Sequence, residues 1–154
     1  MVSEKMERAS ATKSCILYIL KHVDGGRKKL MKLMFLVDYY DTSNNKLTLN
    51  KAIGNQFFVY HYGVFSREVM DGILELIKSG KVIESHYGKL EINPSTTVDI
   101  KNKDLKSKVD AVIKEFGKLE ASKLETETLQ MINLTKESKY ASFGMMVDAI
   151  LVSQ

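Results

Sequence analysis

The side chains that could support catalysis or metal binding are few and widely spaced. No two of the three histidines, His22, His61 and His86, have the spacing of a helical zinc site, and the sequence has no HExxH motif. His61 lies among aromatic residues, which favours a core or interface histidine over a metal ligand. The single cysteine, Cys15, lies on an apolar helical face, where thiols pack without being activated. We therefore expect no enzymatic activity, no metal and no cofactor.

Two aspartates lie close enough in the sequence to form a carboxylate pair. Asp38 and Asp41 could in principle share a general acid–base role. They fall, however, at the end of a predicted helix beside Tyr39 and Tyr40, and we expect a solvated helix end. The sequence also has neither a GxxxxGK[ST] loop nor a GxGxxG loop, so it offers no phosphate cradle.

A group of basic residues could neutralise the phosphates of a nucleic acid. Most of them lie at the start of a predicted helix, where cations oppose the helix dipole, and this hints at a use. A charge run is more often a solvated face, and the net charge of +4 permits nucleic-acid binding without requiring it. The candidate nucleic-acid-binding residues are Arg27, Lys28, Lys29, Lys32, Lys81 and Lys89.

A second group of residues could bind a protein. The aromatic segment 55–62 (NQFFVYHY) alternates, so we expect Phe57, Val59 and Phe65 in the core and the intervening rings on the other face. Exposed aromatic rings often anchor protein interfaces, and the helix that follows presents an acidic face. The candidate partner-binding residues are Tyr60, Tyr62, Glu68, Asp71 and Glu75.

The elements that must position these residues follow from periodicity and punctuation. With 154 residues, 44% of them hydrophobic, the chain fits one α+β domain, 1–154, that is mainly helical. Ser66 is a predicted N-cap, Gly80 a helix end, and Ser122 with Glu125 a capping box. The predicted helices are 10–22, 27–40, 66–79, 103–116, 123–134 and 143–151, with a β-hairpin over 81–93 that turns near Tyr87 and Gly88.

The order of three helices and a short hairpin is that of a winged-helix module. We expect a winged-helix-like part over 10–94 and packed C-terminal helices over 103–154. Two features argue against a DNA-reading role. About 25 residues, 41–65, separate the second and third helices, where a helix-turn-helix has a short turn. The outer face of the third helix carries three acids and two bases, which disfavours contact with phosphates: Arg67, Glu68, Asp71, Glu75 and Lys78.

The sequence shows no sign of export or membrane insertion. The longest uninterrupted apolar run, 15–20, is too short to span a bilayer. The first eight residues are charged and have no apolar core, so we find no signal peptide. We therefore expect a cytoplasmic protein with no membrane partner.

Several segments together resemble the Panacea domain family. Residues 29–38 (KLMKLMFLVD) resemble its KLxKLLYxAD helix, and residues 57–66 (FFVYHYGVFS) resemble its aromatic-x-x-YGP segment. Residues 80–83 (GKVI) and 111–124 (AVIKEFGKLEASKL) match later motifs, while 62–68 (YGVFSRE) is close to the YGPFSxE of related bacterial and archaeal proteins. The resemblance spans about residues 12–135, with the motifs in the family order.

The chain departs from the family pattern at two places. Val64 stands where the family usually has proline, and Thr135-Lys136 stands where many members have a threonine–histidine pair. The first change puts the local backbone geometry in question, and the second removes any role of that histidine.

The resemblance implies a protein that binds other proteins and catalyses nothing. Panacea proteins are mostly antitoxins or antitoxin-like partners, often on mobile elements, and at least one kind is a protease adaptor. We accordingly expect a regulator that binds a toxin or effector protein. A winged-helix DNA-binding transcriptional regulator remains the alternative, and a homodimer is left open.

Overall fold

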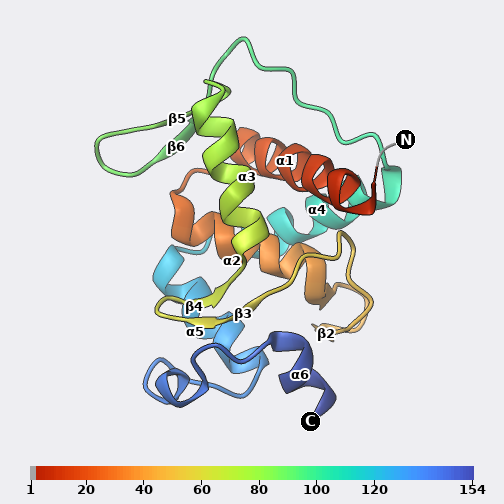
Figure 1. The fold of residues 1–154 in the computed structure, drawn as a ribbon, viewed down its shortest axis with the longest axis vertical. Helices are drawn as coiled ribbons and strands as arrows, with labels where there is room; N and C mark the ends of the chain where they lie inside the picture. Colours follow the sequence, from red (N-terminus) through yellow and green to blue (C-terminus); the bar gives the residue numbers. More distant parts are fainter. Residues whose placement is uncertain (1–2) are drawn as a thin grey trace.

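The computed structural model describes residues 3–154, and the fold is mainly helical α+β. This part of the chain holds six α-helices, one short 3-10 helix and three antiparallel two-stranded sheets (Figure 1). The elements are α1 (Glu4–His22), α2 (Arg27–Tyr39), β1 (Tyr40–Asp41), β2 (Lys46–Leu47), β3 (Phe58–Tyr60), β4 (Gly63–Phe65), α3 (Arg67–Lys78), β5 (Val82–Glu84), β6 (Leu90–Ile92), α4 (Lys103–Phe116), α5 (Ala121–Met131), η1 (Ser138–Ser142) and α6 (Val147–Val152).

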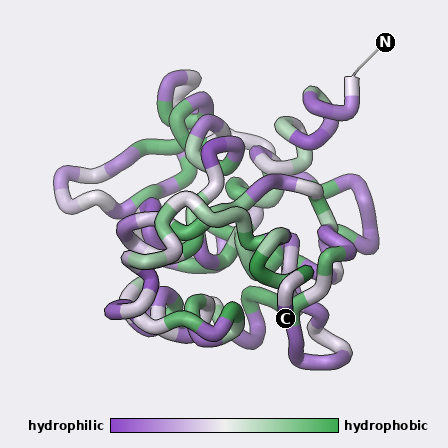
Figure 2. The backbone as a smooth tube through the Cα atoms, turned by 60° about the horizontal axis from the view of Figure 1, so that its bottom comes forward, coloured by the Kyte–Doolittle hydropathy of each residue, from purple (hydrophilic) through white to green (hydrophobic). Residues whose placement is uncertain are grey.

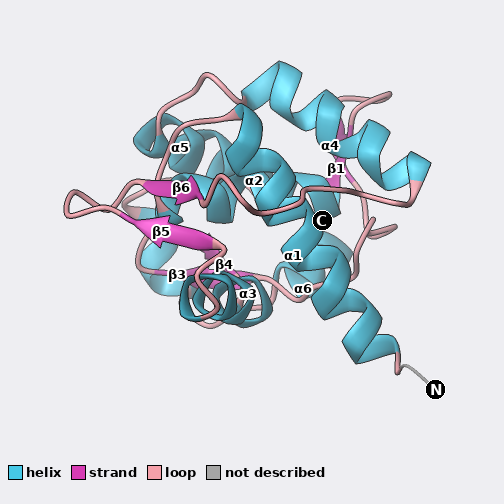
Figure 3. Ribbon diagram, turned by 90° about the horizontal axis from the view of Figure 1, so that it is seen from above, coloured by secondary structure: helices cyan, strands magenta, loops and turns pink. Residues whose placement is uncertain are grey.

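Helix α2 is the centre of the fold. It contacts α1, α3, α4, α5 and β4, and Figure 3 shows it surrounded by them. Every residue from Leu30 to Tyr40 is buried, because apolar side chains occupy all sides of this helix. The mainly hydrophobic stretches cross the middle of the molecule, and hydrophilic stretches form projecting loops (Figure 2). The buried hydrophobic residues of the winged-helix-like part and of the C-terminal helices form one cluster.

Helix α1 is longer than the periodicity predicts. It begins at Glu4 because Ser3 caps it, with Ser3 Oγ accepting a hydrogen bond from Met6 N at 3.2 Å. The helix packs on α3 at Gly72, where an added Cβ would lie 3.3 Å from Ile16 Cδ1. The absence of a side chain at this position therefore allows the close approach of the two helices.

The predicted hairpin is confirmed and is tied to the turn between α1 and α2. Strands β5 and β6 pair antiparallel, with Gly88 at φ +83° in their turn. Leu90 N donates to Gly25 O at 3.0 Å, and Gly26 forms a bridge with Lys89. The predicted N-cap is also confirmed, since Ser66 Oγ accepts from Val69 N at 3.3 Å. The hairpin thus packs beside the helices that precede it, in the order that the sequence predicts.

The segment between α2 and α3 is anchored by Asp38, which corrects the prediction of a solvated helix end. Asp38 is fully buried. Its carboxylate accepts backbone hydrogen bonds from Ile53 at 2.6 Å, Gly54 at 2.8 Å and Asn55 at 3.1 Å. Burial raises the pKa of Asp38, while the three donors oppose that rise. The carboxylate thus holds the loop that leads into β3.

The aromatic segment forms a hairpin, β3–β4. Phe57 and Val59 are fully buried as predicted, whereas Phe65 is only partly buried against the core. Tyr60 and Tyr62 are exposed, as the alternation predicts. The hairpin turns at His61 and Tyr62, and both tyrosine rings lie outside.

The predicted capping box at the start of α5 is wrong. Helix α5 begins at Ala121, so Ser122 and Glu125 form no capping box. Instead, Ser122 Oγ accepts from Lys136 Nζ at 2.7 Å, and Glu125 accepts from Lys139 Nζ at 2.6 Å. These partners lie 14 residues further along the chain, so local sequence gives no sign of them.

The last helix, α6, is shorter than predicted because residues 143–146 run beside β3. Gly144 N donates to Val59 O at 2.9 Å, and Val59 N donates to Met145 O at 3.0 Å. At the start of α6, Asp148 accepts hydrogen bonds from the Tyr39 hydroxyl and from Lys51 Nζ. These contacts fix the C-terminal segment against α2 and the β3–β4 hairpin.

Candidate functional site

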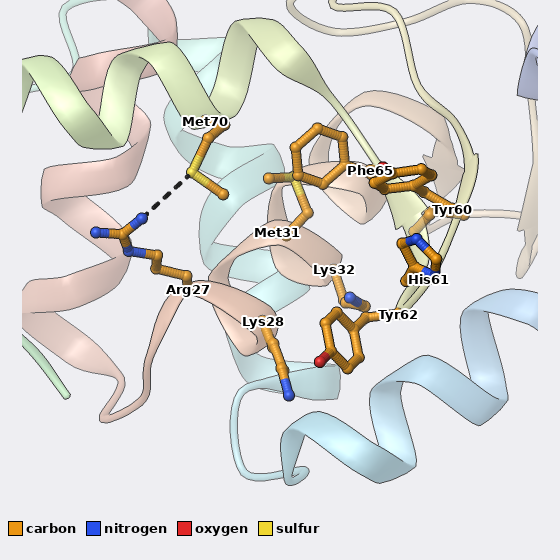
Figure 4. A pocket seen from close by; sticks show the side chains of 10 residues that line it. Arg27, Lys28, Met31, Lys32, Tyr60, His61, Tyr62, Phe65 and Met70 are labelled. Atoms are coloured by element: carbon orange, nitrogen blue, oxygen red, sulfur yellow. Dashed lines mark hydrogen bonds between the residues drawn. The ribbon is translucent and has the colours of Figure 1, made fainter. Parts of the chain in front are cut away.

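A cavity of about 300 Å³ lies between the start of α2, the β3–β4 hairpin and α3 (Figure 4). We call it the α2 cavity. Its walls are mostly apolar, and four lining residues, including His61, come from the hairpin turn and the ends of its strands. The residues that line it are Arg27, Lys28, Met31, Lys32, Tyr60, His61, Tyr62, Val64, Phe65 and Met70. His61 is exposed there, so of the two predicted placements, core or interface, the core is excluded.

Lys32 is a buried cation in the wall of this cavity. It is only 2% exposed, so it is not part of a solvated charged face. Among residues 3–154 no hydrogen bond or ion pair involves its ammonium group. Figure 4 shows the side chain directed toward the ring of Tyr62. Burial lowers the pKa of Lys32 to about 8, with Glu125 opposing the shift and the nearby Lys28 and Lys139 adding to it.

The carboxylate nearest to this charge already has a partner. Glu125 on α5 binds Lys139 Nζ at 2.6 Å, and both side chains are nearly buried. Two ammonium groups, those of Lys32 and Lys139, therefore share one carboxylate. The wall of the cavity therefore carries more positive than negative charge in a poorly solvated place, which favours an anionic ligand.

The two cations at the rim of the cavity, Lys28 and Arg27, have different partners. Lys28 Nζ lies 3.7 Å from the centroid of the Tyr62 ring, a cation–π contact. Arg27 makes a two-point ion pair with Glu84, with both nitrogen–oxygen distances at 2.7 Å. Both oxygens of Glu84 are used in this pair, and the carboxylate charge balances the charge of the Arg27 guanidinium. Arg27 also lies 3.9 Å from Met70 Sδ, as drawn in Figure 4.

An exposed aromatic surface continues from the cavity toward the C-terminal segment. The Phe143 ring is central to it, with centroids 6.0 Å from Tyr60, 5.0 Å from His61 and 5.2 Å from Tyr140. We call the aromatic patch the set Tyr60, His61, Tyr62, Tyr140, Phe143, Met145 and Met146. Tyr60, His61 and Tyr62 belong to both the cavity and the patch, so the two form one continuous feature.

The structure does not join the predicted acidic residues to this feature. Glu68 pairs with Arg8 at 3.5 Å, and Glu75 pairs with Lys13 at 3.0 Å, so both link α3 to α1. Asp71 is exposed. None of the three acidic residues lines the α2 cavity. Of the five predicted partner-binding residues, the structure brings together only the two tyrosines.

The predicted basic residues do not form one free surface either. Lys32 is buried, and Arg27 is paired. Lys89 lies between Asp24 at 3.6 Å and Glu91 at 3.3 Å. The three others are Lys28, which is exposed and lies over the Tyr62 ring, a half-buried Lys29 and an exposed Lys81. Half of this group, Arg27, Lys32 and Lys89, is thus either paired within the fold or buried.

The described residues include neither a metal-binding cluster nor a membrane-spanning helix. Residues 3–154 hold no group of three or more metal-ligating side chains, and none of their helices is long and apolar enough to cross a membrane. Cys15 is fully buried, and burial raises the pKa of its thiol to about 12, which keeps it protonated and inert.

Comparison with known proteins returned no relative. No family model, curated protein or solved structure matches this chain. The Panacea resemblance therefore rests on the motifs quoted above and stays a prediction.

Proposed function

We propose that this protein is a non-enzymatic regulator that acts by binding a toxin or effector protein. The observation that carries the proposal is the exposed aromatic patch beside the α2 cavity. Tyr62 is 54% exposed and Tyr140 is 63% exposed, yet both lie in a packed set of rings and cations. Clustered, exposed aromatic and methionine side chains are typical of protein interfaces.

The rings of the patch are already ordered, which favours binding. Phe143 contacts Tyr60, His61 and Tyr140, and the backbone of Met145 is hydrogen-bonded to β3. A partner would therefore cover side chains that have little conformational freedom left to lose. Met145 and Met146 add flexible apolar surface that can adapt to a partner. This supports a recognition role without any chemistry of the protein's own.

The alternative, a winged-helix DNA-binding regulator, has one observation in its favour. The order of α1, α2, α3 and the β5–β6 hairpin, with Gly26 bridged to Lys89, is that of such a module. The charge distribution argues against it, because Arg27 and Lys89 have internal partners and Lys32 is buried. Such cations would release few counterions from a duplex.

Site-specific photocrosslinking tests the proposal. The photoreactive residue p-benzoylphenylalanine replaces Tyr140 in the patch or, as a matched control, Tyr87 in the β5–β6 turn, which is 96% exposed. In cells that carry the neighbouring genes, we expect one dominant protein adduct from position 140 and none from position 87. The complex is then reconstituted from purified components. Adducts of equal pattern at both positions, or adducts only with a second copy of the chain, would contradict the proposal.

A further inference from the structure

The α2 cavity combines an apolar wall with one buried cation. Met31, Val64 and Phe65 supply apolar surface, and the nearly buried Lys32 lies among them without a hydrogen-bond partner in residues 3–154. A ligand that fits such a cavity needs an apolar body and an opposite charge, because a charge removed from water must be offset. The volume of about 300 Å³ lies at the lower limit of ligand pockets, so it suits one side-chain-sized apolar group.

The charge balance indicates a single negative charge. Glu84 occupies the guanidinium of Arg27 with both oxygens, and Glu125 occupies Lys139. Lys32 is then the one nearly buried lysine among the lining residues that has no anion of its own, and its ammonium nitrogen is not among the fully buried unpartnered polar atoms of residues 3–154, so it stays accessible from the cavity. A phosphate dianion needs several converging donors, whereas a carboxylate is satisfied by one buried ammonium and a few hydroxyl or water contacts.

The continuity of cavity and patch indicates a peptide ligand. Tyr60 and Tyr62 line the cavity and also belong to the exposed aromatic patch, so a chain that leaves the cavity would lie on the patch. An internal peptide segment would bring additional backbone N–H and C=O groups into an apolar space, where they would lack partners. A C-terminal residue carries its carboxylate and its side chain on the same Cα, so both can enter the cavity together.

We propose that the α2 cavity binds the C-terminal residue of a partner protein, with its apolar side chain against Met31 and Phe65 and its carboxylate on Lys32 Nζ. This inference rests on the proposed function, since it names the part of the partner that enters the cavity. It makes Lys32 a recognition residue for a free carboxyl end.

The first test uses the unmodified protein and a pair of matched peptides. Acetyl-Gly-Gly-Phe with a free carboxylate and the same peptide as its C-terminal amide are titrated in a calorimeter. We expect the acid to bind at least about tenfold more tightly than the amide, because the amide leaves the ammonium unpaired. Equal affinities, or no binding of the acid up to about 10 mM, would overturn the inference.

Two further ligands distinguish a peptide C-terminus from a small free acid and from a phosphate. If 3-phenylpropionate binds more tightly than the peptide acid, the site serves a small free acid and the C-terminal assignment falls. If phenyl phosphate binds more tightly than both acids, the carboxylate assignment falls. We expect the peptide acid to bind most tightly of the three, since only it reaches the aromatic patch.

A variant pair locates the binding. Lys32→Met keeps an unbranched side chain that is one atom shorter and removes its charge, and Lys101→Met makes the same change at an exposed lysine outside the cavity. We expect Lys32→Met to abolish the preference for acid over amide and Lys101→Met to retain it. A preference that survives in folded Lys32→Met would overturn the inference. Photocrosslinks at position 140 that persist while the peptide acid fails would leave the proposed function standing and remove only this inference.

Discussion

Glu125 holds the ammonium of Lys139 at 2.6 Å and leaves Lys32, its other cationic neighbour, without an anion of its own. Both members of the pair are nearly buried, and Lys32 is 2% exposed. A protein that needed only stability would be expected to replace an uncompensated buried lysine by an apolar residue. The site beside α2 therefore has the character of a binding site, where charge is kept at a cost in stability.

Replacing Lys32 should stabilise the protein. We expect Lys32→Met to raise the free energy of unfolding at pH 7 by roughly 1–3 kcal/mol, because the variant removes a buried charge whose desolvation opposes folding. Urea denaturation followed by circular dichroism measures the change, with Lys101→Met as the control that should stay within about 0.5 kcal/mol of the parent protein. A destabilised Lys32→Met would show that the ammonium is already well compensated.

The stabilisation that we expect from Lys32→Met should become smaller at alkaline pH. Lys32 has a pKa of about 8 in the folded protein and an ordinary value of 10.5 when unfolded, so the folded state holds fewer protons between these values. The destabilisation caused by the charge of Lys32 is fully present below pH 8 and disappears as the pH rises toward 10.5. The groups facing it are Lys28 on α2, Glu125 on α5, Lys139 in η1 and His61 in the hairpin turn. Unfolding measured at pH 7 and pH 10 should show the two proteins converging, and a constant difference would contradict the assignment.

The two members of the Glu125–Lys139 ion pair should contribute to stability in a coupled way. Glu125→Gln is expected to destabilise the protein by about 3 kcal/mol, because two buried ammonium groups then lack a counter-charge. The double variant Glu125→Gln with Lys139→Met should recover part of this loss, since it removes one of those charges. A double-mutant cycle in urea measures the coupling. Additive single effects would mean that the pair is not coupled.

Asp38 should be essential for the loop that leads to β3. Asp38→Ala leaves the backbone N–H groups of Ile53, Gly54 and Asn55 without their acceptor, and we expect a loss of about 3 kcal/mol. Asp71→Ala, at an exposed aspartate, is the control and should change stability little. Thermal unfolding compares the two, and equal melting temperatures would contradict the anchoring role.

Local signals predicted the elements that depend on local contacts. Helix α4 begins and ends where its periodicity and the following Gly117 indicate, and Ser66 caps α3 as its position suggests. Long-range contacts account for most of the misses. Asp38 accepts hydrogen bonds from residues more than a dozen positions away, and Glu125 pairs with Lys139 instead of capping a helix. No periodic pattern contains that information.

The candidate site was predictable only in part. The exposure of Tyr60 follows from alternation along β3, whereas Tyr62 lies in the turn, after which the alternation changes and Val64 is buried. Phe143 could not be placed, because it joins Tyr60 only when residues 143–146 run beside β3. Lys32 resembled a solvated charge, yet neighbours surround α2 on all sides and bury it. The four-residue spacing of Lys28 and Lys32, which puts them on one helix face, was the available signal.

The DNA-binding alternative makes a clear counter-prediction. We expect fluorescence anisotropy with the duplex upstream of this protein's own gene to show no tight binding even at low salt, because three of the six basic residues, Arg27, Lys32 and Lys89, are paired or buried. Tight binding that weakens with salt and with Lys28→Ala and Lys29→Ala together would contradict this and favour a transcriptional regulator.

The most direct test of the central claim is the dissociation constant of the reconstituted partner complex with patch variants. Tyr60→Ala and Tyr140→Ala should each weaken the complex by about tenfold or more, since exposed aromatic anchors often carry a large part of the binding free energy. Tyr87→Ala, at a still more exposed tyrosine in the β5–β6 turn, should leave it unchanged. Unchanged affinity in the folded patch variants, or an equal loss in Tyr87→Ala, would contradict the account.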